Sequence, residues 1–373
     1  MRGFIYFHEN WPNFYWQTEE LVTQLAAVRN LQGKLTGKMT HLGFDLRNKA
    51  YLETLSQDII KSSEIEGESL SLKQVRSSIA VRLGIDIEEQ TLNTRNVDGI
   101  VEMMLDATQN CDSELNENRL FAWHNALFPN GMSGMYKVIV GAWRDDSTGP
   151  MQVVSGGLGR QKVHFQAPKA EIVAQEMRHF LEWFNAEQDQ DPILKAAIAH
   201  LWFLTIHPFE DGNGRIARAI TDMILTKAEN KSQRFYSMSA QIEQQRKGYY
   251  LILEKTQKGN LDITKWLKWF LECLKNAIFA AENIVEKVLF KHRFWAFHSK
   301  KPLNKRQIKI INLLLDSFKG KLKTSKWAKI NKCSQDTALR DIQDLISKGI
   351  LRKETAGGRS TCLLYTSDAA DDW

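Results

Sequence analysis

Residues 207–218 read HPFEDGNGRIAR and contain the side chains best suited to chemistry. A predicted helix over 191–206 ends just before His207, and a second predicted helix begins after the Gly-Asn-Gly run at 212–214. Glycines let backbone amides approach an anion closely, and a helix N-terminus offers unpaired N–H groups to phosphate. The spacing therefore predicts a polyphosphate-binding loop between two helices.

Charged side chains surround this loop. Arg215 and Arg218 lie one helical turn apart and can bind further phosphate oxygens bidentately. Asp211 can hold a Mg²⁺ ion that bridges those phosphates, and His207 is a titratable base beside the anion site. The set predicts phosphate-transfer chemistry. The alternative is that His207 caps a helix and the glycine-rich turn is only a tight connection.

The string matches the signature HxFx(D/E)GNGRxxR at every fixed position, so the sequence resembles the Fic family. The resemblance implies a mostly helical core that transfers AMP from ATP to a Ser, Thr or Tyr hydroxyl of a target protein, self-modification included. His207 would accept the proton of that hydroxyl, Phe209 would anchor the core and Asp211 would ligate Mg²⁺. The phosphates would lie against Gly212, Asn213, Gly214, Arg215 and Arg218.

A second motif concerns regulation. Residues 62–67 read SSEIEG and fit the family's inhibitory pattern (S/T)xxxE(G/N) at Ser62, Glu66 and Gly67. The resemblance implies that Glu66 pairs with Arg218 and blocks a productive position of the γ-phosphate. A carboxylate there occupies the guanidinium and repels phosphate. The alternative is an ordinary helix end capped by Gly67.

Residues 136–166 interrupt the helical pattern. The β-branched runs YKVIVGAWR, MQVVSGG and KVHFQAP are separated by Gly and Pro, which predicts short strands or a hairpin. Residues 151–166 resemble the family's flap, which would pair with an extended target segment and bring its hydroxyl to the catalytic histidine. Val163 and His164 would also touch the nucleotide. The alternative is a purely structural hairpin.

Helical periodicity dominates the rest of the chain, so the predicted fold class is mainly α with one small β-hairpin. The predicted helices span 17–40, 45–66, 69–83, 93–110, 116–128, 168–187, 191–206, 213–230, 241–258 and 262–290. Three residues fall where family members place the adenine and ribose pocket: Tyr249, Tyr250 and Gln257. Aromatic faces suit a purine, but a Tyr pair on a helix is equally consistent with core packing.

The basic residues are concentrated near the C-terminus. The chain of 373 residues has 50 Lys and Arg against 44 Asp and Glu, a net charge of +6, whereas residues 301–360 hold 15 basic and 5 acidic residues, a local charge of +10. This block resembles a winged helix-turn-helix of three short helices and a wing. Its third helix would expose Thr337, Arg340 and Asp341 to DNA bases. DNA binding and protein docking both stay open.

We expect four segments: a helical N-terminal domain carrying the inhibitory motif (1–95), the Fic core with trailing helices (96–298), the winged helix (299–360) and a tail (361–373). The tail turns small and acidic, so we interpret it as non-native and expect the wing to lack its return strand. Scattered cysteines and the lack of a signal peptide or membrane span predict a cytoplasmic protein without a disulfide or zinc site. The resemblance also makes a homodimer a candidate state.

Three alternative functions stay open. In the first, the chain is a DNA-binding regulator whose Fic core senses nucleotide. In the second, it is an enzyme that removes AMP from modified proteins, with Glu66 aligning the water. The same fold would also suit transfer of UMP or another phosphate-bearing group.

Overall fold

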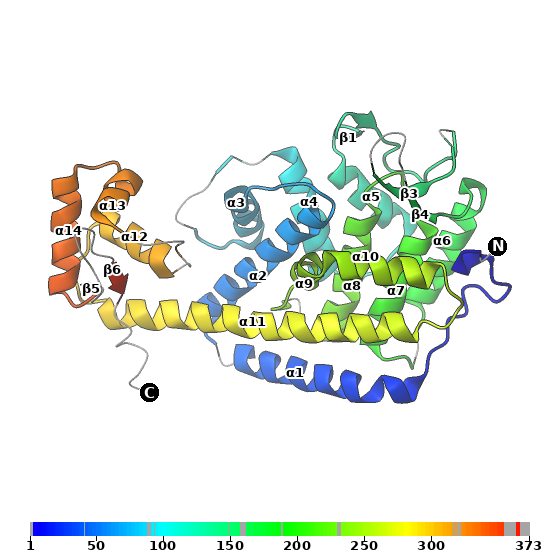
Figure 1. Cartoon of the computed structure of the whole chain (residues 1–373), viewed down its shortest axis with the longest axis horizontal. Helices are drawn as coiled ribbons and strands as arrows, with labels where there is room; N and C mark the ends of the chain where they lie inside the picture. Colours follow the sequence, from blue (N-terminus) through cyan, green and yellow to red (C-terminus); the bar gives the residue numbers. More distant parts are fainter. Residues whose placement is uncertain are drawn as a thin grey trace. The chain divides into compact units, whose positions relative to one another are not determined.

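The computed structural model of the chain (Figure 1) describes residues 3–40, 42–87, 91–92, 94–147, 149–156, 162–187, 189–229, 233–315, 318, 322–353 and 363–365. The chain divides into two compact units, Met1–Glu282 and Asn283–Trp373. The division falls within one long helix, whereas composition places a boundary near residue 298, and the four predicted segments remain predictions.

The first unit is mainly helical, as predicted. Its short 3-10 turns are η1 (Ile5–Phe7) and η2 (Thr18–Glu20). Its α-helices are α1 (Val22–Thr40), α2 (Phe44–Ile65), α3 (Leu72–Leu83), α4 (Arg95–Gln109), α5 (Glu117–Leu127), α6 (Ala170–Asn185), α7 (Pro192–Ile206), α8 (Asn213–Ala228), α9 (Met238–Gln244), α10 (Arg246–Gln257) and the first part of α11 (Thr264–His298).

Two helices form the centre of this unit. Every residue of α7 from Ile193 to Ile206 except Lys195 is buried, as expected for a helix that is apolar on all sides. α8 packs along α7 and also contacts α2, α4, α5 and α9. The Asp191 side chain accepts the N–H of Ile193 and Pro192 occupies the first turn, which fixes where α7 starts. The loop between α7 and α8 is thus held by buried helices on both sides.

The strands are shorter than predicted. β1 (Met132–Ser133) pairs with β2 (Tyr136–Lys137), and β3 (Gln152–Ser155) pairs antiparallel with β4 (Lys162–Gln166). The prediction of a strand through YKVIVGAWR is wrong beyond Lys137. The N–H of Ile139 is donated to a Glu210 carboxylate oxygen (2.7 Å), so this backbone group binds a side chain of the motif loop instead of a neighbouring strand. The β3–β4 hairpin is the predicted flap, with 157–161 outside the described residues.

Two predicted helices differ from those observed. The predicted helix 241–258 is two helices, because the backbone leaves the helical region at Gln245, between α9 and α10. The predicted helix 262–290 continues to His298. Within the described residues, no helix is long and apolar enough to cross a membrane.

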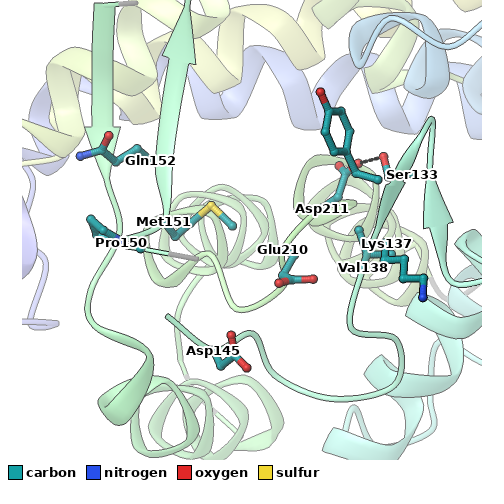
Figure 2. A pocket seen from close by; sticks show the side chains of 11 residues that line it. Ser133, Lys137, Val138, Asp145, Pro150, Met151, Gln152, Glu210 and Asp211 are labelled. Carbon is teal, nitrogen blue, oxygen red and sulfur yellow. Dashed lines mark hydrogen bonds between the residues drawn. The ribbon is translucent and has the colours of Figure 1, made fainter. Parts of the chain in front are cut away.

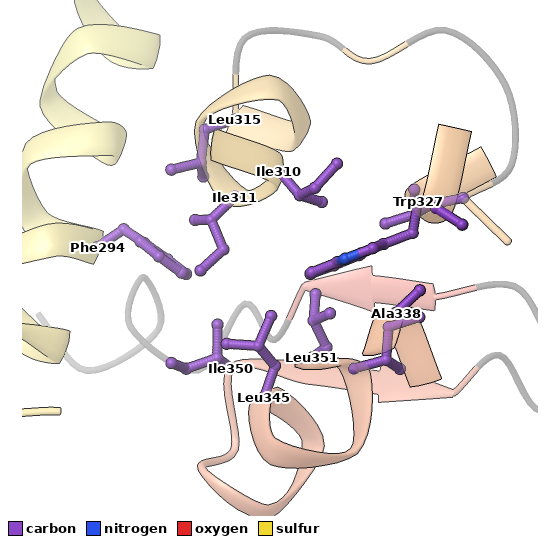
Figure 3. Close-up of a cluster of buried hydrophobic side chains, with 12 residues drawn as sticks. Phe294, Ile310, Ile311, Leu315, Trp327, Ala338, Leu345, Ile350 and Leu351 are labelled. Atoms are coloured by element: carbon purple, nitrogen blue, oxygen red, sulfur yellow. The ribbon is translucent and has the colours of Figure 1, made fainter. Parts of the chain in front are cut away.

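The second unit contains the rest of α11, then α12 (Lys305–Leu315), α13 (Thr324–Asn331), α14 (Gln335–Ser347), β5 (Leu351–Lys353) and β6 (Leu363–Tyr365). Its hydrophobic core includes Trp327 of α13 together with Phe294, Ile311 and Leu345 (Figure 3). β6 pairs antiparallel with β5, so the expectation of a missing return strand is wrong. The winged-helix assignment and the non-native tail remain predictions, and most of that tail lies outside the described residues.

Candidate active site

His207 ends α7 in a left-handed conformation, with φ 53° and ψ 60°. This conformation costs a non-glycine residue roughly 1–2 kcal/mol, and such strain clusters at functional sites. The ring Nδ1 lies 3.3 Å from the carbonyl oxygen of Leu204. Because a carbonyl only accepts, Nδ1 carries the proton and Nε2 is the basic nitrogen. Burial lowers the pKa of His207 to about 4, with a smaller contribution from Arg144, so the ring is neutral at pH 7.

The loop after His207 is closed by one side chain. The Asn213 amide donates to the carbonyl of Phe209 (2.7 Å) and its Oδ1 accepts the N–H of the same residue (3.0 Å). Phe209 is fully buried, and its ring stacks on His124 at 4.2 Å between centroids. The Asn213 side chain therefore shapes the loop from inside, which leaves backbone N–H groups for the predicted phosphate contact.

Arg144 is a positioning residue that sequence reasoning missed. Its side chain is fully buried, and its Nε donates to the carbonyl of His207 (2.7 Å). Its main-chain N–H donates to Pro208 (2.9 Å), and its guanidinium also contacts Asp146 and the carbonyl of Pro168. These contacts tie the motif loop to the segments before and after the flap. A single arginine at the end of an apolar run was the only signal in the sequence.

Glycine is required at the start of α8. Gly212 has φ +80°, and a Cβ there would lie 2.9 Å from the Phe128 ring. At Gly214 a Cβ would lie 2.0 Å from Oε1 of Glu66. The Glu66 carboxylate therefore lies directly against the first turn of α8, where the sequence places the phosphates.

The predicted inhibitory residues meet the second motif arginine. Nη2 of Arg218 lies 2.8 Å from Oε1 of Glu66, and its Nε donates to Ser62 Oγ at 2.8 Å. Burial, the largest single effect, would lower the pKa of Arg218, but the charge and hydrogen bond of Glu66 together with Tyr249 and Tyr250 raise it overall. Gly67, at φ +85°, follows the end of α2. The chain thus brings together all the residues of the predicted inhibitory contact.

A second ion pair was missed by sequence reasoning. Nη1 of Arg215 lies 2.8 Å from Oε2 of Glu68, two residues beyond Glu66. The Arg215 guanidinium also packs over the ring of Phe128 at 5.0 Å. The Glu68 side chain is 45% exposed, so this pair is more accessible to water than the Glu66 pair. Both motif arginines are therefore bound by carboxylates from the segment directly after α2.

Asp211 lies beside a cavity of about 470 Å³ (Figure 2). One of its carboxylate oxygens accepts the Ser133 hydroxyl, and the other accepts the N–H of Gly212 at 2.6 Å. The cavity is also lined by Glu210 and Asp145. No group of three or more metal-binding side chains occurs in the part of the chain that the structure describes. Mg²⁺ needs only one or two protein carboxylates when substrate phosphates complete its shell, so the donor chemistry of Asp211 fits this ion.

The predicted flap residues differ in their surroundings. Val163 is 41% exposed on β4. The His164 ring bridges two side chains, with Nδ1 2.7 Å from the Glu254 carboxylate and Nε2 2.5 Å from the Ser155 hydroxyl. Val163 is thus accessible to a ligand, while the His164 nitrogens are already hydrogen-bonded.

The predicted adenine-pocket residues lie mostly in the core. Tyr249 is buried and its hydroxyl lies 2.9 Å from Nε2 of His200. Gln257 is also buried, with its amide 3.4 Å from the carbonyl of Leu204. Tyr250 is the exposed member, and its hydroxyl approaches the carbonyl of Ile65 at 3.4 Å. Burial favours the packing alternative for Tyr249 and Gln257, and the nucleotide role of all three stays a prediction.

The fold and loop define a helical domain in which a neutral histidine precedes the N-terminus of a helix that carries two arginines. Residues 114–225 match the Fic/DOC family, so this part of the chain is a Fic domain. Residues 4–85 match a domain of unknown function (DUF4172).

Several curated proteins are similar to the chain. A protein adenylyltransferase Fic of Drosophila grimshawi is 26% identical over 241 residues, 62% of this chain and 43% of that protein. A protein adenylyltransferase fic-1 of Caenorhabditis briggsae is 28% identical over 225 residues, 57% of this chain and 42% of that protein. The chain therefore spans less than half the length of these relatives.

Solved structures share the fold. A Fic family protein from Desulfovibrio desulfuricans G20 has a TM-score of 0.55 at 20% identity, covering 95% of this chain and 98% of its own. A Fic domain-containing signaling protein from Bacteroides thetaiotaomicron has a TM-score of 0.51 at 19% identity, covering 70% of this chain and 98% of its own. These likenesses support the mainly helical Fic fold.

Proposed function

We propose that this chain transfers AMP from ATP to a Ser, Thr or Tyr hydroxyl of a target protein. The observation that carries the proposal is the neutral His207 ring, whose Nε2 is available as a base next to the N-terminus of α8. The curated relatives are named protein adenylyltransferases, which supports ATP as the nucleotide.

The reaction is an in-line displacement at the α-phosphorus, in which positioning and charge neutralisation matter most. Nε2 of His207 takes the proton of the target hydroxyl, the new O–P bond forms, and the bond to the β-phosphate breaks, which releases pyrophosphate. A positioned base contributes roughly 10²–10⁴-fold in rate.

The phosphates would bind the backbone of Gly212–Gly214 and the two arginines of α8. Nε of Arg215 and Nη1 of Arg218 are buried donors without a hydrogen-bond partner among the described residues, which supports an anion as their ligand. Asp211 would hold Mg²⁺, which neutralises phosphate charge when bound.

We further propose that Glu66 inhibits the site. Its carboxylate lies against Gly214 and binds Arg218, so a phosphate at either position meets negative charge. The exposed edge of the flap at Val163 would take an extended target segment by strand pairing, and Tyr250 would contact the nucleotide.

The test measures labelling with α-³²P-ATP and Mg²⁺, with and without a lysate as the source of targets. Glu66→Gly is expected to increase labelling about tenfold or more, because it removes the blocking carboxylate. A tenfold change corresponds to roughly 1.4 kcal/mol. Adding His207→Ala to this variant is expected to abolish labelling. Equal labelling by the wild type and Glu66→Gly would contradict inhibition, and labelling that survives His207→Ala would contradict the base.

Two controls complete the design. Circular dichroism melting of each variant separates lost chemistry from lost folding. Parallel incubations with UTP and mass spectrometry of the product identify the transferred group, and a product of different mass would replace AMP in the proposal.

A further inference from the structure

The second unit has an unusual distribution of charge around α13. Lys323, Lys326, Lys329 and Lys332 follow each other at three-residue spacing and all are exposed, and no acidic residue lies between 322 and 335. Lys326 also packs over the Phe318 ring at 4.2 Å. The two ends of this helix and its last turn therefore present Lys323, Lys329 and Lys332 to solvent, in a stretch of sequence without an acidic residue.

Two of the three acidic residues in 322–353 are neutralised by ion pairs within the unit. Asp341 is buried, and its carboxylate accepts Nε (2.7 Å) and Nη2 (2.9 Å) of Arg306, so the prediction of Asp341 as an exposed base contact is wrong. Asp344 accepts Nζ of Lys348 at 2.6 Å and is also bound by Gln307. Residues 322–353 contain eight basic and three acidic residues, and two of those three are engaged in ion pairs.

The next helix presents a polar face beside these lysines. Ala338 and Leu345 of α14 and Trp327 of α13 belong to one buried hydrophobic cluster (Figure 3). Ile342 is a member of the same cluster, so the two helices are held together. The exposed side of α14 consists of Gln335, Asp336, Leu339, Arg340, Gln343 and Ser347. Ser334 caps this helix through the N–H of Thr337, which fixes where the polar face begins.

We propose that this unit binds duplex DNA, with the α13 lysines on the phosphate backbone and the exposed face of α14 towards the major groove. A row of lysines suits the regular phosphates of a duplex. The polar face of α14 has hydrogen-bonding groups for base edges, with Arg340 suited to guanine and Gln335 or Gln343 to adenine. Leu339 is the only large hydrophobic side chain exposed on α14, whereas the centre of a protein-docking face is more apolar. The proposal does not depend on AMP transfer.

The test uses the full chain and a fluorescein-labelled 30-base-pair duplex of mixed sequence, with anisotropy titrations from 50 to 200 mM KCl. The test variant is Lys323→Ala/Lys329→Ala/Lys332→Ala. The matched control is Lys34→Ala/Lys49→Ala/Lys265→Ala, which removes three exposed lysines from the first unit. Each lost phosphate contact is expected to reduce the slope of log K against log salt by about 0.9, so the test variant loses about 2.7 and the control loses nothing.

Three outcomes would overturn the proposal. The first is that the wild type does not bind the duplex in a salt-dependent way, and the second is that the two triple variants lose the same slope. The third is that poly-glutamate competes as well as unlabelled duplex at equal charge concentration. The last result would indicate an acidic protein as the partner. A second variant, Arg340→Ala, keeps the backbone lysines and is expected to weaken binding about tenfold, within the 1–3 kcal/mol of one base contact, to the best-bound duplexes of a sequence-selected pool. If Arg340→Ala binds the selected duplexes no more tightly than unselected ones, Arg340 carries the selectivity. If this variant prefers the selected duplexes as strongly as the wild type does, the role of α14 is contradicted.

Discussion

Oε1 of Glu66 would lie 2.0 Å from a Cβ on Gly214, so only a residue without a side chain lets this carboxylate reach the first turn of α8. The contact joins residues far apart in the chain and places a negative charge where backbone N–H groups would otherwise meet phosphate. The glycine of the motif thus serves both the proposed phosphate site and the carboxylate that blocks it.

The Glu68–Arg215 pair adds a weaker block. In the Glu66→Gly background, Glu68→Gln is expected to lower the KM for ATP about two- to fivefold, because an exposed ion pair of roughly 0.2–1 kcal/mol no longer competes for Arg215. Labelling rates measured over a range of ATP concentrations give the KM. Glu64→Gln is the matched control, since Glu64 pairs with Lys61 instead of a motif arginine. The same KM in both variants would contradict the competition.

The low pKa of His207 predicts a flat pH profile. Because burial holds this pKa at about 4, Nε2 is unprotonated through the whole range from pH 8 to pH 6. Labelling by Glu66→Gly at saturating ATP is expected to change less than twofold over that range. An ordinary histidine, with a pKa near 6.5, would lose most of its base form there. A fall in rate with a midpoint near pH 6.5 would show that the ring is more exposed to water than its contacts indicate.

Much of the site could be predicted because its residues are close in sequence. The string from His207 to Arg218 fixes a loop and a helix start by local rules, and the helix periods placed α7 and α8 within a few residues. Arg144 and Glu68 could not be found this way. Each meets its partner only after distant helices pack, and neither lies in a pattern with a recognisable period.

The errors have a similar origin. The sequence predicts an exposed Asp341, because charged residues on a short helix usually face water, but Arg306 of α12 binds its carboxylate and the side chain is buried. The β-branched residues of 138–144 predict a strand, yet the N–H groups of Ile139 and Arg144 bind the motif loop. In both cases tertiary contacts override local preference.

His200 predicts how stability depends on pH. Its ring is buried between the hydroxyls of Thr221 and Tyr249, each at 2.9 Å, and burial lowers its pKa to about 3, with Arg218 adding to the effect. The unfolded chain takes up a proton below pH 6.5 and the folded chain does not until about pH 3. The stabilising contribution is therefore fully present above pH 6.5 and is lost as the pH falls between these values.

The measurement compares urea unfolding at pH 7.5 and pH 5. His200 is expected to account for a loss of about 2 kcal/mol between them. His200→Gln keeps one donor and one acceptor but does not titrate, so it is expected to remove that part of the difference. Only the difference between the two pH values is interpreted, because the variant also changes packing. An unchanged difference would mean that His200 is protonated in the folded chain at pH 5.

Gly99 provides a test of the core that supports α8. It lies on α4 where that helix packs on α5, and a Cβ there would lie 1.8 Å from the carbonyl oxygen of Ala126. Backbone cannot move aside as a flexible side chain can, so Gly99→Ala is expected to destabilise the chain by about 1–3 kcal/mol. Gly33→Ala is the matched control, because nothing lies within 4 Å of a Cβ on this α1 residue. Helix propensity alone predicts that this control stabilises the chain by up to about 1 kcal/mol. Urea unfolding followed by tryptophan fluorescence compares the two, and a shift of the same sign in both variants would show that α4 and α5 do not pack this closely in solution.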